Sequence, residues 1–193
     1  NGSVDITGTG SSLIRADGNV VVNGDLFSFT GAALTLESVN GGLSSNASPL
    51  DGDIDFSDGG TLTINQGGAT TYNALISAQD FSLINGDLTL TNNNSVGFGS
   101  ASISGAGTSL IAAGPLGLFS GAPLSIGSNA SLQHLGATTT GSEVLTIGAL
   151  SGAGQLVIDQ TEDVVEVGSL GTSTTFSGTI SGAGGFGKVG AGV

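Results

Sequence analysis

The sequence predicts an all-β fold, a right-handed parallel β-helix with three short strands in each coil. Three observations support this prediction: a recurring unit of two apolar residues around a small or polar one, a regular spacing between these units, and short connections rich in Gly, Asn, Ser and Asp. Side chains alternate across a strand with period two. Each unit is therefore expected to form a short strand with one buried face.

The expected strands recur along most of the chain. Two longer gaps in the series predict additional, weaker strands near Leu43 and Tyr72. The clear units are Phe27-Ser28-Phe29, Leu34-Thr35-Leu36, Ile54-Asp55-Phe56, Leu62-Thr63-Ile64, Phe81-Ser82-Leu83, Leu88-Thr89-Leu90, Val96-Gly97-Phe98, Leu124-Ser125-Ile126 and Leu145-Thr146-Ile147.

The spacing of the units distinguishes a solenoid from a sandwich. Neighbouring units commonly begin seven or eight residues apart, and three such steps give a period of about 22 to 24 residues, which is typical of solenoids. Parallel strands normally need long helical crossovers, for which these connections are too short. An antiparallel β-sandwich is the alternative. Few Asn-Gly or Asp-Gly hairpin signals lie between matched strands, which favours the β-helix.

Composition restricts the partners. The 193 residues include 38% apolar residues, enough for a core, and no Cys, and only Arg15 and Lys188 are basic against 15 acidic residues. Phosphate binding depends on Lys and Arg, so no nucleic acid partner is expected, and docking on an anionic membrane is disfavoured. No stretch approaches the roughly 20 apolar residues of a membrane span. The outer surface should consist mainly of Ser, Thr, Asn and Gly.

Three related glycine-rich elements lie at 103–110, 150–156 and 180–186. The last belongs to 176–192, FSGTISGAGGFGKVGAG, which resembles the passenger-associated transport repeat of bacterial autotransporters: a Gly-rich turn, an apolar residue, a Lys and a second Gly-rich turn. The segment 124–132 is similar to coils of autotransporter and filamentous-haemagglutinin passengers.

This resemblance implies a secreted right-handed β-helix, carried across the outer membrane by a separate C-terminal barrel and displayed outside the cell or at the bacterial cell surface. Residues 1–193 are then expected to be one β-helical segment of a longer passenger, with 176–192 as the best match to the transport repeat.

The same glycine-rich run contains two apparent nucleotide-binding motifs. Residues 182–187 satisfy G-x-G-x-x-G, and 182–188 satisfy the first seven places of a P-loop. Both motifs require a helix after the loop, and Val189 stands where a P-loop needs Ser or Thr. A structural turn is therefore expected, and no cofactor.

One dense acidic group could hold calcium, which prefers oxygen ligands. An EF-hand is ruled out because its Gly and Glu places hold Phe56 and Leu62. Since Ile54 and Phe56 are expected to point inward, solvent-facing carboxylates are the favoured interpretation and a weak calcium site is the alternative. The group consists of Asp51, Asp53, Asp55 and Asp58.

No catalytic residue is expected. His134 is the only histidine, its sequence neighbours form no known triad, and no G-x-S-x-G nucleophile turn occurs. The pairs Thr61/Thr63 and Thr89/Thr91 are like those of ice-binding β-helices. Such a face must repeat in register, and the adjacent strands are expected to carry Ser28, Asp55 and Gly97 instead. Strand propensity is the preferred explanation for these threonines.

These observations predict a structural, adhesive role: cell-cell or cell-matrix adhesion, either by self-association or by contact with a surface glycan or matrix through an extended polar surface. A filament-forming extracellular protein is one alternative. A carbohydrate-active enzyme that uses carboxylates of the 51–58 group on a neutral glycan is the other.

Overall fold

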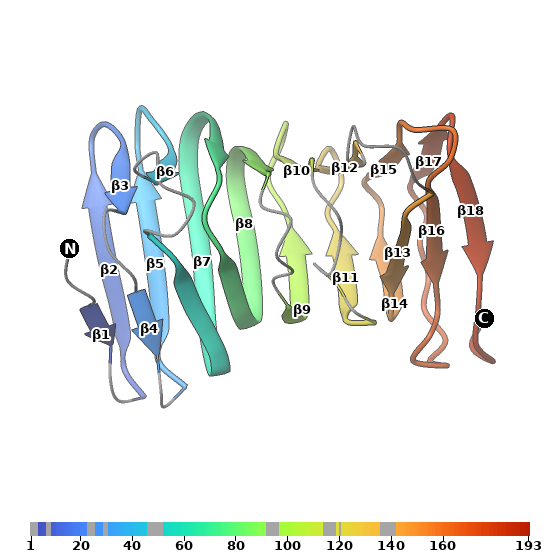
Figure 1. Ribbon diagram of the computed structural model, residues 1–193, viewed down its shortest axis with the longest axis horizontal. Helices are drawn as coiled ribbons and strands as arrows, with labels where there is room; N and C mark the ends of the chain where they lie inside the picture. Colours follow the sequence, from blue (N-terminus) through green and yellow to red (C-terminus); the bar gives the residue numbers. More distant parts are fainter. Residues whose placement is uncertain are drawn as a thin grey trace.

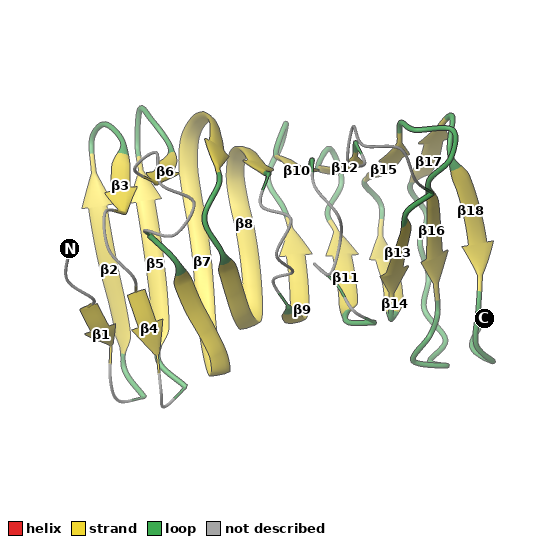
Figure 2. Cartoon of the chain, in the orientation of Figure 1, coloured by secondary structure: helices red, strands yellow, loops and turns green. Residues whose placement is uncertain are grey.

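The chain folds as a parallel β-solenoid of about seven turns (Figure 1). The computed structural model describes residues 4–6, 9–22, 26–28, 31–45, 52–91, 97–113, 119, 121–135 and 142–193. Within these residues all regular secondary structure is β-strand, and loops connect the strands; there is no helix (Figure 2). The all-β prediction and its parallel solenoid are thus confirmed, and the antiparallel β-sandwich is excluded.

Each coil passes through three faces in order, here called the first, second and third faces. Two long bent strands, β7 (Ile54–Tyr72) and β8 (Ile76–Leu90), run through all three. The first face also holds β1 (Val4–Ile6), β4 (Leu26–Ser28), β13 (Val144–Ile147), β16 (Val164–Val167) and β18 (Gly185–Lys188).

The second and third faces form the longest stacks. The second holds β2 (Ser11–Ala16), β5 (Ala33–Ser38), most of β9 (Phe98–Ile103), β11 (Pro123–Ile126) and β14 (Ala149–Gly152). The third holds β3 (Val20–Val22), β6 (Leu43–Ser45), β10 (Ser109–Ala112), β12 (Ser131–His134), β15 (Gln155–Ile158) and β17 (Thr179–Gly182).

Strand pairing is parallel and aligns like residues. On the third face, Leu88 pairs with Leu110, Leu110 with Leu132, and Leu132 with Leu156. All four leucines are fully buried. The period-two units therefore stack as inward columns that form one continuous core, and each coil supports its neighbours.

Two weak strands predicted from gaps in the series are also present. Leu43 begins β6 and Tyr72 ends β7, and both side chains are buried. The Tyr72 hydroxyl donates a hydrogen bond to the Gly52 carbonyl, which satisfies its polar end inside the core. Residues 29 and 96 of two expected units lie outside the described residues.

The glycine-rich elements mark corners, but not always the same corner. Elements 103–110 and 150–156 connect the second face to the third, whereas 180–186 connects β17 on the third face to β18 on the first. Gly152 and Gly182 have φ angles of 107° and 116°, which only glycine adopts readily. Residues 183–184 form the turn between β17 and β18, as expected, and residues 189–193 contain no helix.

Candidate functional site

The second face carries a column of outward hydroxyl groups. Its members pair successively across neighbouring coils, and Ser82 Oγ lies 2.9 Å from Ser102 Oγ. The column comprises Thr35, Thr63, Ser82, Ser102, Ser125 and Ser151.

This register corrects the expected neighbours of the threonine pairs. Thr63 lies between Thr35 and Ser82, and not beside residues 28 or 55. Thr89 lies between Thr71 and Ile111. The prediction failed because coil lengths differ, so an average period does not identify the partner of a given strand. The hydroxyl column is continuous on the second face and is interrupted by Ile111 on the third.

A shallow polar groove of about 500 Å³ crosses the third face over β8, β10, β12 and β15. Outward positions of paired strands and residues of the corners before β10 and β12 line it. Ser131 Oγ donates a hydrogen bond of 3.0 Å to Ser109 Oγ. We call this surface the polar groove. Its polar lining residues include Asp87, Ser109, Asn129, Ser131, Gln133 and Gln155.

Two members of the predicted acidic group, Asp53 and Asp55, accept hydrogen bonds within the protein. Asp55 Oδ1 accepts hydrogen bonds from the Ser57 backbone nitrogen, from Ser57 Oγ at 2.7 Å and from Ser77 Oγ at 2.6 Å. Asp53 Oδ1 accepts one from the Leu75 backbone nitrogen. Both residues are half-buried and Asp58 is exposed, whereas Asp51 lies outside the described residues. The four-carboxylate calcium site stays a prediction.

Asp55 should make stability depend on pH. Burial tends to raise the pKa of Asp55, but the hydrogen bonds from Ser57 and Ser77 outweigh it and hold the pKa below the ordinary value of an aspartate. Stability from these bonds is therefore present above about pH 4 and is lost as pH falls through the lower, folded-state value. Ser77→Ala should cost about 1 kcal/mol near pH 7, and less at about pH 2.

Thermal melts of wild type and Ser77→Ala across this pH range measure the effect. Ser82→Ala is the control, because it breaks a hydroxyl pair that contains no titratable group. A destabilisation by Ser77→Ala that is constant with pH would contradict the assignment.

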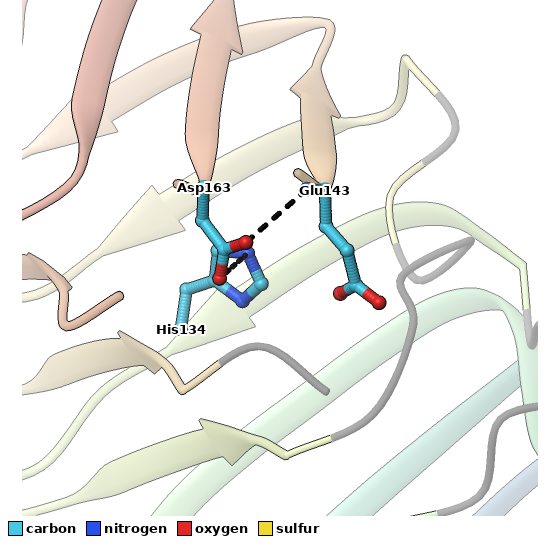
Figure 3. A group of neighbouring side chains, drawn as sticks. All are labelled: His134, Glu143 and Asp163. Atoms are coloured by element: carbon cyan, nitrogen blue, oxygen red, sulfur yellow. Dashed lines mark hydrogen bonds and ion pairs between the residues drawn. The ribbon is translucent and has the colours of Figure 1, made fainter. Parts of the chain in front are cut away.

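A second polar cluster lies at the edge of the core, and we call it the histidine cluster. It consists of His134, Glu143 and Asp163 (Figure 3). His134 ends β12, Glu143 directly precedes β13, and Asp163 directly precedes β16. Asp163 Oδ1 accepts a hydrogen bond of 3.2 Å from the Glu143 backbone nitrogen, and Asp163 Oδ2 lies 3.3 Å from His134 Nε2. His134 and Asp163 are buried, and Glu143 is half-buried.

The interior position of His134 decides its charge. Its column continues through Ala112 and Ile158, which are apolar. Burial lowers the pKa of His134, and this effect outweighs the opposing influence of Asp163, Glu143 and other carboxylates. The neutral imidazole is thus the favoured form, and the Asp163 contact joins a carboxylate to a neutral ring.

Sequence reasoning considered His134 but missed its partners. Glu143 and Asp163 lie on later coils, and their proximity depends on the pairing of β13 with β16. One signal was present in the sequence: His134 alternates with Leu132, so it had to point inward and needed a polar partner there.

Comparisons with known proteins provide no further information. No protein-family model, curated protein or solved structure matches the chain. Within the described residues, no helix is long and apolar enough to cross a membrane.

Proposed function

We propose that the chain is a segment of a secreted or cell-surface adhesin that contacts a second copy of itself through the polar groove. The observation that carries this proposal is the in-register polar lining, which repeats over β8, β10, β12 and β15. A repeated surface favours a partner with the same repeat, because each small contact recurs on the next coil. Multiple weak contacts acting together can give firm attachment.

The resemblance of 176–192 to the transport repeat supports an autotransporter passenger as the source of this segment. With 15 acidic and two basic residues in the chain, hydroxyl and amide groups would make most of the contacts of such a surface. A surface glycan or matrix is the alternative partner for the same groove, because hydroxyl and amide side chains form hydrogen bonds with sugars as well as with a second copy of the chain. No catalytic residue is part of the proposal.

Sedimentation velocity over a concentration series tests self-association. The solution needs about 0.15 M salt, because a formal charge of −13 opposes association at low ionic strength. We expect the wild-type chain to associate as concentration rises. Gln155→Glu should weaken association at least about tenfold, because it places like charges opposite each other in the contact.

Ser125→Glu is the matched control. It makes the same change in net charge at an exposed position on the second face, so it should associate like wild type. A wild-type chain that stays monomeric throughout would contradict self-association, and glycan binding would then be tested on an array with the same two variants.

End-to-end assembly into a filament, in which the strand edges of one copy recruit the strands of the next, stays a prediction.

A further inference from the structure

The histidine cluster joins three segments that are distant in sequence. His134 comes from one coil, Glu143 from the next, and Asp163 from the coil after that, where β16 pairs with β13. One potential ligand atom from each residue lies within 4.8 Å of the others. Figure 3 shows the Asp163 carboxylate against the His134 ring, with the Glu143 side chain beside them.

One oxygen of the Asp163 carboxyl group is buried without a hydrogen-bond donor. The residue is 2% exposed, and Oδ2 accepts no hydrogen bond among the described residues. The two basic residues of the chain are engaged elsewhere: Arg15 pairs with Glu37, and Lys188 donates to the carbonyls of Val189 and Gly190. A buried carboxylate oxygen without a donor is costly, and a bound positive ion would satisfy it.

The spacing of the cluster suits a metal ion. Ligands at about 2.0 to 2.1 Å from a tetrahedral centre lie about 3.3 Å from each other, and this is the separation of Asp163 Oδ2 and His134 Nε2. Glu143 is half-buried and its carboxylate ends a flexible side chain. Its ligand oxygen lies within 4.8 Å of the ligand atoms of His134 and Asp163.

We propose that His134, Glu143 and Asp163 bind one divalent transition-metal ion of the zinc type. An imidazole nitrogen with two carboxylate oxygens is a donor set that zinc accepts, whereas calcium and magnesium prefer oxygen ligands alone. Two carboxylates balance the charge of the ion. The ion would tie β12 to the starts of β13 and β16, and so clamp successive coils together. This inference does not depend on the proposed adhesive function.

Metal titration of the purified chain, after treatment with a chelator and dialysis, tests the proposal. Calorimetry with Zn²⁺ should show one saturable equivalent per chain. Co²⁺ should bind at the same site and give the visible absorption of a tetrahedral centre. Zn²⁺ should also raise Tm, because it binds the folded chain. Glu143→Gln should weaken Zn²⁺ binding at least about tenfold.

Asp58→Asn is the control, because it removes an exposed carboxylate from the other acidic group and should leave Zn²⁺ binding unchanged. Asp163→Asn should abolish binding. If that buried variant fails to fold by circular dichroism, the half-buried Glu143→Gln decides the matter. Absence of saturable binding, or equal affinity in wild type and Glu143→Gln, would overturn the proposal.

Discussion

Replacing Phe81 by alanine should lower the free energy of unfolding by about 3 to 5 kcal/mol. Phe81 is fully buried on the second face. Its ring stacks on Phe98 with centroids 4.3 Å apart and an interplanar angle of 11°, and Phe98 in turn contacts Phe119 at 6.0 Å. Alanine would leave a cavity in the middle of the solenoid, where coils on both sides hold the backbone in place and limit collapse.

Urea unfolding followed by far-ultraviolet circular dichroism measures this change. Val144→Ala is the control, because it removes an apolar side chain from an outward position of β13 that is 51% exposed, and it should cost less than about 1 kcal/mol. Equal losses for the two variants would contradict the view that stacked inward columns supply most of the stability.

Replacing Gly152 by alanine should cost about 3 kcal/mol or more. Its φ of 107° is unfavourable for any residue with a side chain, and a Cβ there would collide with the Ile126 carbonyl of the preceding coil. The change would therefore strain the corner and also separate β14 from β11.

Two other glycines separate these effects. Gly107 has a φ of 77° but open space around its Cα, so alanine there should cost only the backbone strain, about 1 kcal/mol. Gly97 has neither restriction, and alanine there should be neutral or slightly stabilising. Thermal melts of the three variants should rank Gly152 as most affected and Gly97 as least. A cost at Gly97 equal to that at Gly152 would contradict this account of the corners.

The coil architecture could be predicted from the sequence because its signal is local. Units such as Leu62-Thr63-Ile64 have Leu62 and Ile64 buried and Thr63 half-buried, as alternation requires. Because the glycine-rich connections are too short for helical crossovers, such strands can pair in parallel only if the chain coils into a solenoid.

The pairing partners could not be predicted, because coils vary in length. Leu34 pairs with Leu62, 28 residues later, but Leu62 pairs with Phe81, only 19 residues later. An error of a few residues in counting assigns the wrong neighbour, as happened for Thr63. The same variation concealed the polar groove and the histidine cluster, which both depend on which coil lies beside which.

The acidic group illustrates a different difficulty. The sequence shows that Asp53 and Asp55 alternate with inward residues, and the structure agrees, with Ile54 and Phe56 buried. The sequence does not show that Ser77, on the next coil, donates a hydrogen bond to Asp55. A carboxylate that appears available for calcium in the sequence is thus already engaged between coils.

The central functional claim is that the polar groove of one copy contacts the polar groove of a second copy and so joins the surfaces that carry them. A bead-clumping assay tests this claim most directly. Beads coated with the wild-type chain should aggregate with one another, and beads coated with Gln155→Glu should stay dispersed. Beads coated with Ser125→Glu should aggregate like wild type. Dispersed wild-type beads, or aggregation that Gln155→Glu does not reduce, would contradict adhesion through the polar groove.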